Sequence, residues 1–440
     1  MPRVYAKRSC ACLLTASLLL LTFLTWPPIP VSINHPPTTA FSVQSPNAER
    51  SDYVEVTESN GAEVLLPWFM GGGSVTPTAG PAGHRSRLWP AQRPGDDRIT
   101  AQLMFKPAVV TPNRLKTILM YNGLGSWAPA KTGRSVFSHC PVNTCTLTSN
   151  KAESNKADAI LYRDHFVHPG HHRSSRQVWI LYMLECPYHT QHMKYNDVFN
   201  WTATYRRDSD IVAPYEKWVY YDDRVRQLAR PLRNYAANKT RQVAWFVSNC
   251  GARNGRLHYA KELQKYIGVD IFGSCGTKKC PRTNQALCFS MLDNEYKFYL
   301  AFENSNCKDY ITEKFFVNGL GRDILPIVMG ARPEDYEKSA PKNSYIHVDD
   351  FDSPKELANY LHMLDKDDEL YNSYFRWKGT GEFINTHFFC RLCALLHDDF
   401  PIKSYRNINE WWRGRGICTS GSWRKQGTNW AIEIAKNDNQ

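Results

Sequence analysis

Polar residues that could carry out acid–base or phosphate chemistry directly follow apolar runs in this sequence. Glu185 follows the apolar run 177–184, and Glu303 and Asn304 follow the run 297–302. If these runs are strands of open parallel sheets, their carboxyl ends face the crevice in which such sheets bind ligands. A carboxylate there suits a general base, although a solvated glutamate at the end of a strand explains Glu185 about as well.

A helix start and separate basic residues supply candidate phosphate-binding groups. Thr312 can cap a helix whose free N–H groups point at the same crevice as Glu303, and Lys314 lies beside it. The helix start and Lys314 could hold a diphosphate, while Glu303 or Glu313 could accept hydrogen bonds from ribose or sugar hydroxyls. Arg256 opens another helix and offers a second place for phosphate. Each group alone could be a salt-bridged helix terminus, but together they predict a nucleotide-sugar site in the C-terminal half.

The elements that must position these residues alternate between short apolar runs and helical stretches, a pattern typical of a parallel α/β architecture. A linker-like segment, 230–240, separates two such halves. We therefore expect two Rossmann-like domains that face a cleft, at 113–235 and 241–402. The expected strands are 116–122, 157–162, 177–184, 242–248, 269–272, 297–302, 324–329 and 345–348. The expected helices include 257–267, 312–320 and 355–364, the last with a capping box of Ser353 and Glu356.

The N-terminus carries a membrane-targeting pattern. Basic residues in the segment 1–9 precede an uncharged, mostly apolar run, 10–26, which ends at two prolines. We interpret this run as a retained signal-anchor rather than a cleaved signal peptide, because no small-residue cleavage pattern precedes the prolines. The segment 1–9 is then cytoplasmic and the rest of the chain lumenal. Thirteen of the 26 prolines lie in 27–112, which we expect to be a stem, although the apolar patch 64–70 supports an irregular but packed lobe instead.

Cysteines and glycosylation sequons fit a secretory lumen. Two of the 13 cysteines lie in the predicted anchor, and an oxidising compartment should pair most of the others, with at least one thiol left over. The sequons at Asn200 and Asn238 are predicted glycosylation sites. The net charge of +12 would suit a nucleic acid, but the anchor and the sequons count against that partner.

The remaining motifs indicate structural roles rather than a bound cofactor. Neither a G-x-G-x-x-G motif nor a P-loop is present. A D-x-D motif at 208–210 could grip a metal-bound nucleotide and the histidines of 168–172 could bind a metal, but a turn and a solvated loop are simpler interpretations. The pair Cys390-x-x-Cys393 fits structural disulfides better than a redox or zinc site. We therefore predict no metal site, and we expect 403–440 to be a basic aromatic tail.

The polar end of the run 297–302 resembles a known family. Phe302-Glu303-Asn304-Ser305, followed by Asp-Tyr-Ile-Thr-Glu-Lys-Phe-Phe at 309–316, is similar to the signature of the α1,3-fucosyltransferases of glycosyltransferase family 10. The segments 205–211 and 247–249 and the pair Cys390-x-x-Cys393 resemble family stretches in the same order, so the resemblance covers about 116–397. Two further segments, 250–254 and 372–377, resemble the plant and invertebrate branch that fucosylates the innermost N-acetylglucosamine of N-glycans.

The resemblance implies a GT-B fold, a lumenal catalytic domain on a type II anchor in the Golgi membrane, GDP-fucose as donor, and inversion at the sugar carbon. Glu185 would deprotonate the acceptor hydroxyl, in a loop where relatives usually carry Glu-Ser-Pro and this chain has Cys186. Arg256 and Lys314 would neutralise the diphosphate as it leaves. The scheme requires no metal, although Mn²⁺ or Mg²⁺ could assist the leaving group. The residues that would hold the nucleotide and fucose are Asn304, Tyr310 and Glu313, with Glu303 near the sugar.

Three functions follow from these observations, in order of preference. The first is transfer of fucose in α1,3 linkage to the innermost N-acetylglucosamine of N-glycans. The second keeps the chemistry but uses N-acetyllactosamine or Lewis-type antennae as acceptors. The third is a catalytically inert glycan-binding protein, against which the joint presence of four functional residues argues: Glu185, Arg256, Glu313 and Lys314.

Overall fold

The computed structural model describes residues 65–79, 87–108, 114–125, 131–398 and 403–424. The predicted cytoplasmic segment 1–9, the predicted anchor 10–26 and much of the predicted stem lie outside these residues. Within the described ranges, no helix has both the length and the apolar character needed to cross a membrane. The described residues of 65–122 and 132–424 belong to one compact unit, which contains both of the large sheets.

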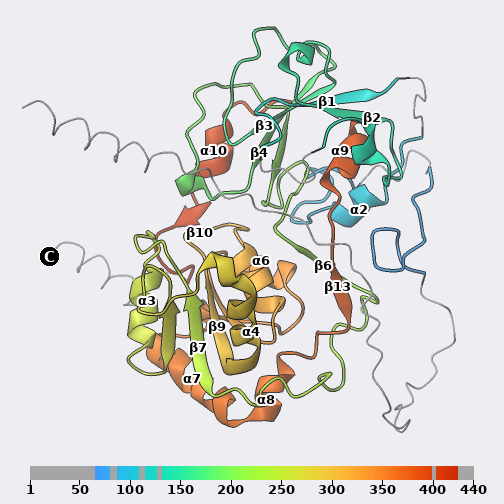
Figure 1. Ribbon diagram of the computed structural model, residues 1–440. Coiled ribbons are helices and arrows are strands. Elements are labelled where there is room, and N and C mark those ends of the chain that lie inside the picture. Colours follow the sequence, from blue (N-terminus) through green and yellow to red (C-terminus); the bar gives the residue numbers. More distant parts are fainter. Residues whose placement is uncertain (1–64, 80–86, 109–113, 126–130, 399–402, 425–440) are drawn as a thin grey trace, which may run out of the picture. The chain divides into compact units, whose positions relative to one another are not determined.

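The first large sheet is five-stranded and entirely parallel, with the strand order β2-β1-β3-β4-β5 (Figure 1). Its strands are β1 (Lys116–Met120), β2 (Cys145–Thr148), β3 (Ala159–Arg163), β4 (Val178–Met183) and β5 (Trp201–Thr204). The predicted strands at β1, β3 and β4 are confirmed, and all six residues of β4 are buried. Apolar runs do not predict β5, because two of its four residues are threonines. Thr202 and Thr204 are nevertheless buried, since the side chains of Asp210 and Ser209 complete their hydrogen bonds.

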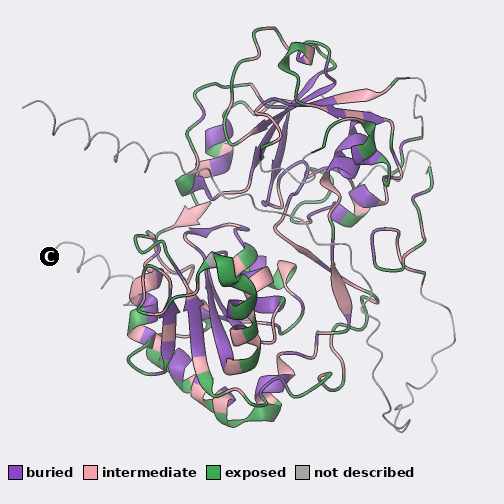
Figure 2. Ribbon diagram, viewed as in Figure 1, coloured by how far each residue is buried: buried purple, intermediate pink, exposed green. Residues whose placement is uncertain are grey.

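The second large sheet is also parallel, with the order β12-β11-β9-β7-β8. Its strands are β7 (Arg241–Phe246), β8 (Val269–Phe272), β9 (Tyr296–Phe302), β11 (Leu325–Met329) and β12 (Ile346–His347). Val243 of β7 packs in one core with residues of α3 (Arg256–Leu263) and α7 (Pro354–Lys366), whereas the next residue, Ala244, packs with α4 (Gln285–Glu295) on the opposite face. Helices therefore cover both faces of this sheet, whose strands are mostly buried in Figure 2. Two Rossmann-like α/β domains confirm the predicted GT-B class.

Shorter elements connect and flank the two sheets. Two small antiparallel pairs join segments far apart in the sequence, β6 (Lys217–Tyr220) with β13 (Gly381–Ile384) and β10 (Asn306–Cys307) with β14 (Cys418–Thr419). The other helices are α2 (Ile99–Leu103), α5 (Glu313–Phe315), α6 (Pro333–Ser339), α8 (Asp368–Ser373), α9 (Phe388–Leu396) and α10 (Ile408–Arg413). Single helical turns lie at η2 (Arg134–Phe137), η3 (Lys151–Glu153), η4 (Pro187–His189), η5 (Arg282–Asn284), η6 (Phe316–Leu320, a π-turn) and η7 (Val348–Asp350).

Five disulfides connect the described part of the chain, and Cys186 is its free cysteine. This confirms the prediction of disulfides with a thiol left over. The two cysteines of the C-x-x-C pair bond to different partners, Cys140–Cys390 and Cys145–Cys393, so the pair is structural. Both bonds fix α9 beside the first sheet, although the sequence pattern assigns α9 to the second domain. The other pairs are Cys250–Cys275, Cys280–Cys288 and Cys307–Cys418.

The last part of the predicted stem is folded rather than extended. Phe69 and Ile99 are buried in a small core that also contains Val212 and Ile384. Arg98 is 1% exposed, and its guanidinium donates to the backbone carbonyls of residues 207 and 209. The prediction of a stem up to residue 112 is therefore wrong for 65–79 and 87–108. In these proline-rich segments, turns and side chains supply hydrogen-bond partners for the backbone N–H and C=O groups, although there is little regular secondary structure.

The buried guanidinium of Arg98 should contribute strongly to stability. We expect Arg98→Ala to lower the free energy of unfolding by about 3 kcal/mol, because it removes the donor of two backbone carbonyls, at residues 207 and 209, and empties the space of a large buried side chain. Urea unfolding of the full chain measures the change. Arg93→Ala is the matched control, since the side chain of Arg93 is 49% exposed and forms only a surface ion pair with Asp96. An equal effect of the two substitutions would contradict this role for Arg98.

Candidate active site

Glu185 lies just beyond the carboxyl end of β4 and meets side chains that follow β9 of the other sheet. Its Oε1 accepts hydrogen bonds from the Tyr310 hydroxyl at 2.7 Å, the Asn304 amide at 3.4 Å and the backbone N–H of Cys186 at 2.8 Å. The Glu185 side chain is 44% exposed. The structure therefore brings together three predicted site residues, and it does so at the carboxyl ends of strands from both sheets.

These hydrogen bonds decide the charge of Glu185. Burial alone would raise the pKa of this carboxyl, but the donors from Cys186, Tyr310 and Asn304 stabilise the anion and hold the pKa below its usual value. Burial raises the pKa of the Tyr310 hydroxyl far above its usual value, so the hydroxyl keeps its proton and remains a donor. Glu185 is therefore an ionised, solvent-accessible carboxylate near neutral pH.

Glu303 lies beneath the site rather than in it. Its side chain is completely buried. One oxygen accepts from the Thr312 N–H at 2.7 Å, and the other accepts from the Thr312 hydroxyl at 2.9 Å and lies 3.2 Å from Lys314 Nζ. A side chain at Gly330 would meet the Cβ of Glu303 at 2.7 Å, so glycine is required there. Glu303 therefore acts through Thr312 and Lys314, which its two oxygens position, and its proximity to the sugar stays a prediction.

Lys314 is a positive charge held by two carboxylates at the start of α5. Its Nζ donates to the Thr312 hydroxyl at 2.9 Å and to Glu313 at 3.1 Å, and it pairs with Glu303. Burial alone would lower the pKa of Lys314, but the charges of Glu303 and Glu313 raise it above the usual lysine value. Lys314 remains 22% exposed and Glu313 49% exposed, so both side chains can reach a ligand.

Arg256 is a buried charge that donates hydrogen bonds to backbone carbonyl groups. It is 4% exposed, and its guanidinium donates to the carbonyls of Phe302 at 2.8 Å and Asn249 at 3.0 Å. Its Nε is buried and has no hydrogen-bond partner among the described residues. Burial lowers the pKa of Arg256. A buried guanidinium whose Nε–H has no acceptor among the described residues suits an anionic ligand at the carboxyl ends of β7 and β9.

Sequence patterns do not reveal that the C-terminal segment 418–424 completes this region. Trp423 Nε1 donates to the carbonyl of Gly330 at 2.8 Å, and the Asn306 amide donates to the carbonyl of Gly421 at 2.8 Å. Asn254, which is 1% exposed, donates to Asn306 and to the carbonyl of Glu303. The segment therefore lies across the carboxyl ends of β9 and β11. The signal in the sequence for this contact was Cys418, a cysteine that needs a disulfide partner and finds it in Cys307.

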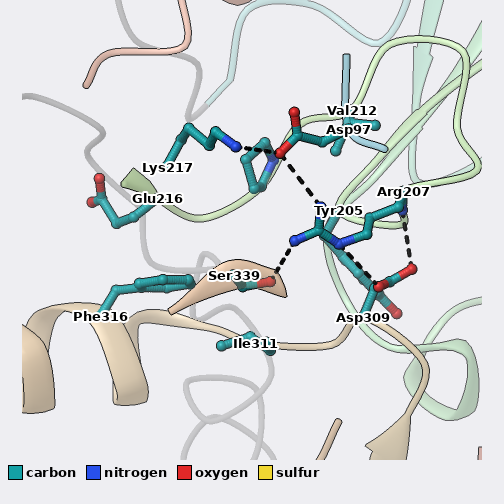
Figure 3. A pocket seen from close by; sticks show the side chains of 11 residues that line it. Asp97, Tyr205, Arg207, Val212, Glu216, Lys217, Asp309, Ile311, Phe316 and Ser339 are labelled. Carbon is teal, nitrogen blue, oxygen red and sulfur yellow. Dashed lines mark hydrogen bonds and ion pairs between the residues drawn. The ribbon is translucent and has the colours of Figure 1, made fainter. Parts of the chain in front are cut away.

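A pocket beside the site is lined by an ion-pair network (Figure 3). Arg207 lies between Asp97 at 3.5 Å and Asp309 at 3.7 Å, and it donates to the Ser339 hydroxyl at 2.9 Å. Burial and the neighbouring Asp335 raise the pKa of Asp309 to about 6. None of the predicted site residues lines this pocket. We therefore assign a structural role to the ion-pair network, which connects Asp97 through Arg207 to Asp309 and Ser339.

Two other predictions can be compared with the structure. The D-x-D motif is structural: Asp208 pairs with Arg206 and Lys308, and the buried Asp210 accepts from the Thr202 N–H. Asn200 is only 8% exposed, and its amide donates to the backbone carbonyl of residue 403, so a glycan on this amide would have to displace that contact. Asn238 is exposed, and its glycosylation remains a prediction.

Comparison with known proteins gives the following similarities. Residues 113–216 match the family model "Fucosyltransferase, N-terminal", and residues 236–411 match "Glycosyltransferase family 10 (fucosyltransferase) C-term". The chain is 63% identical over 352 residues to glycoprotein 3-alpha-L-fucosyltransferase A of Drosophila melanogaster, which covers 78% of this chain and 70% of that one.

More distant similarities include a human enzyme and a solved structure. The chain is 40% identical over 281 residues to a 4-galactosyl-N-acetylglucosaminide 3-alpha-L-fucosyltransferase of Homo sapiens, which covers 61% of this chain and 75% of that one. A crystal structure of an alpha1,3-fucosyltransferase with GDP-fucose matches with a TM-score of 0.42 and 18% identity, over 70% of this chain and 97% of that chain.

Proposed function

The chain belongs to glycosyltransferase family 10, the fucosyltransferases, and we propose that it transfers L-fucose from GDP-fucose to the innermost N-acetylglucosamine of N-glycans, in α1,3 linkage and with inversion. The observation that carries the proposal is the ionised, exposed carboxylate of Glu185 beside Tyr310 and Asn304. The 63% identical relative supports the acceptor, because its name specifies a glycoprotein.

Glu185 acts as the general base. Its three hydrogen bonds all go to Oε1, which leaves Oε2 to accept the proton of the acceptor hydroxyl. Tyr310 and Asn304 fix the orientation of the carboxylate, so that the acceptor oxygen and the base are aligned before the reaction. As the proton moves to Oε2, the acceptor oxygen forms a bond to the anomeric carbon of fucose and the bond to the diphosphate breaks.

Arg256 and Lys314 supply the positive charge that stabilises the departing GDP. Lys314 is held in a fixed position by Glu303 and Thr312, and Arg256 is held by two carbonyls, so neither needs to reorganise during the reaction. The exposed carboxylate of Glu313 is placed to accept hydrogen bonds from donor hydroxyls. No metal is required for these steps, and Mn²⁺ or Mg²⁺ would only assist the leaving group.

The pH dependence of transfer should report the hydrogen bond from Tyr310. Tyr310→Phe removes a donor that stabilises the Glu185 anion, so the pKa of Glu185 rises. Because the base must be ionised, we expect the acid limb of the kcat/KM profile to move to higher pH, by up to about one unit. Tyr195→Phe is the control, since Tyr195 is 54% exposed on the following loop. An acid limb that stays in place or moves to lower pH would contradict this role.

The acceptor is tested with two substrates and mass spectrometry. The full chain is incubated with GDP-fucose and either an N-glycan core glycopeptide or N-acetyllactosamine. Fucose on the innermost N-acetylglucosamine of the glycopeptide alone supports the proposal. Transfer to lactosamine alone would favour the acceptor named for the 40% identical human relative, and transfer to neither would favour an inert glycan-binding protein.

We also propose that the chain is a single-pass type II protein of the Golgi membrane, anchored by 10–26, with its catalytic part in the lumen. The five disulfides support this placement, because such bonds persist in oxidising compartments. In intact Golgi vesicles the catalytic part should resist added protease until detergent is present. Digestion without detergent would contradict the topology.

A further inference from the structure

Three side chains with metal-ligating atoms of different kinds converge at the catalytic carboxylate. A carboxylate oxygen of Glu185, the sulfur of Cys186 and Nδ1 of His189 all lie within 4.8 Å of one another. Cys186 Sγ lies 3.1 Å from His189 Nδ1, which in turn lies 3.8 Å from Glu185 Oε1. All three residues come from the end of β4 and the following turn η4, so one short segment presents the whole set.

The distances fit a tetrahedral zinc ion. Zinc bonds of about 2.0 to 2.3 Å to oxygen, nitrogen and sulfur place neighbouring ligand atoms about 3.3 to 3.6 Å apart. The two observed distances, 3.1 and 3.8 Å, lie on either side of this range, so small side-chain rotations would complete the geometry. A thiol, an imidazole and a carboxylate together select zinc over Mg²⁺ or Mn²⁺, which prefer oxygen ligands.

This cluster differs from the two other His- and Cys-containing clusters of the described chain. Those clusters contain Cys390 in one case and Cys145 with Cys393 in the other, and all three sulfurs are engaged in disulfides. A disulfide sulfur cannot become the thiolate that binds zinc. Cys186 is the free cysteine of the described residues, so its cluster alone offers a thiol together with a carboxylate.

The cluster can be reached from solvent through two of its three ligands. The side chains of Glu185 and His189 are 44% and 37% exposed, whereas Cys186 is fully buried beneath them. Cys186 Sγ also donates to the Ser305 hydroxyl at 3.1 Å, which holds the sulfur in place. An ion that enters from the exposed side would meet the carboxylate and the imidazole first and the sulfur last, with water as its fourth ligand.

We propose that Glu185, Cys186 and His189 form a zinc-binding site, and that Zn²⁺ bound there inhibits fucose transfer. Inhibition rests on the proposed function, because it requires Glu185 to be the base. A carboxylate that ligates Zn²⁺ through Oε1 shares its negative charge with the ion, so Oε2 becomes a much weaker base for the proton of the acceptor hydroxyl. The ion displaces one proton, from the Cys186 thiol, and no redox step is involved.

Zinc binding is measured directly and in parallel with transfer. The full chain, freed of metal with a chelator, is titrated with Zn²⁺ and separately with Mg²⁺ in a calorimeter, while fucose transfer is followed at the same metal concentrations. We expect one Zn²⁺ per chain and loss of transfer in proportion to occupancy, with no such loss on Mg²⁺ addition. Co²⁺ in place of Zn²⁺ should produce the near-ultraviolet charge-transfer absorption of a thiolate ligand.

Variants separate the site from adventitious binding. Cys186→Ser, which keeps the backbone N–H that donates to Glu185, should weaken Zn²⁺ binding by about tenfold or more, abolish the cobalt absorption and make the rate of transfer independent of added Zn²⁺. His189→Ala should weaken binding similarly. His192→Ala is the matched control, because His192 is an exposed histidine of the same loop outside the cluster, and it should bind Zn²⁺ as the unmodified chain does.

Either of two results would overturn the zinc site: no calorimetric Zn²⁺ binding by the unmodified chain, or equal binding by the Cys186→Ser variant. Failure of the proposed function would look different. In that case the metal-free chain transfers no fucose at all, while the calorimetric titration and the cobalt absorption still report whether the three ligands bind the ion.

Discussion

Glu185→Gln is expected to lower kcat for fucose transfer by about 10²- to 10⁴-fold, the usual contribution of a positioned general base. Glutamine has nearly the same shape, and its carbonyl oxygen can still accept hydrogen bonds from Tyr310 and from the Cys186 N–H. The amide cannot take the proton of the acceptor hydroxyl. Affinity for GDP should remain nearly unchanged, because Arg256 and Lys314, the proposed ligands of the diphosphate, belong to the domain of the second sheet. Steady-state kinetics and calorimetric GDP titration measure the two quantities.

The matched control for this substitution is Glu295→Gln. Glu295 is 47% exposed, close to the 44% of Glu185, but it precedes β9 and so lies at the opposite end of the sheet from the site. Its substitution should leave both kcat and GDP affinity unchanged. If Glu185→Gln weakened GDP binding as strongly as it lowered kcat, the carboxylate would belong to the donor subsite and another residue would be the base.

The strands that position the site could be predicted because their residues are buried on both faces. A strand covered on both sides is a continuous apolar run, as β4 is and as β9 is from Phe298 onward, and the residue that follows it lies at the ligand-binding edge of a parallel sheet. That rule places Glu185 at such an edge of the first sheet and Asn304 at such an edge of the second. The odd number of cysteines after the predicted anchor likewise predicts a free thiol, but it does not predict which cysteine stays unpaired.

Long-range polar contacts could not be predicted in the same way. Arg98 is buried because two carbonyls more than 100 residues away accept its hydrogen bonds, and no local period signals such a contact. Trp423 reaches Gly330 across a comparable separation in sequence. The folded part of the predicted stem and the segment 418–424 both depend on contacts of this kind, so composition alone suggests a stem and a tail.

Glu303 illustrates why the role of a site residue could not be predicted from the sequence. Residues after a strand point alternately to opposite sides, and the sequence does not say which side carries the ligand. Asn304 points toward Glu185, whereas Glu303 turns inward to Thr312 and Lys314. Two neighbouring residues of one motif therefore have different roles, the first positioning the cation and the second orienting the base.

Lys314→Met should lower kcat/KM by about 10²- to 10³-fold, because it removes a preorganised positive charge from the departing diphosphate. It should also lower the free energy of unfolding by about 2 kcal/mol, since it leaves the fully buried carboxylate of Glu303 without its ion pair. Loss of activity in this variant alone could therefore come from lower stability. Urea unfolding and steady-state kinetics of Lys314→Met measure the two effects, and they are the reference for a second variant that also carries Glu303→Gln.

The double variant Glu303→Gln with Lys314→Met separates the two effects. Glutamine at 303 can still accept from the Thr312 N–H but carries no charge that needs a partner, so most of the lost stability should return. Activity should not return, because the positive charge is still missing. Recovery of both would mean that Lys314 serves only to neutralise Glu303 and that Arg256 alone stabilises the diphosphate. Recovery of neither would mean that the Glu303 carboxylate itself, fixed by Thr312, is needed to shape the site.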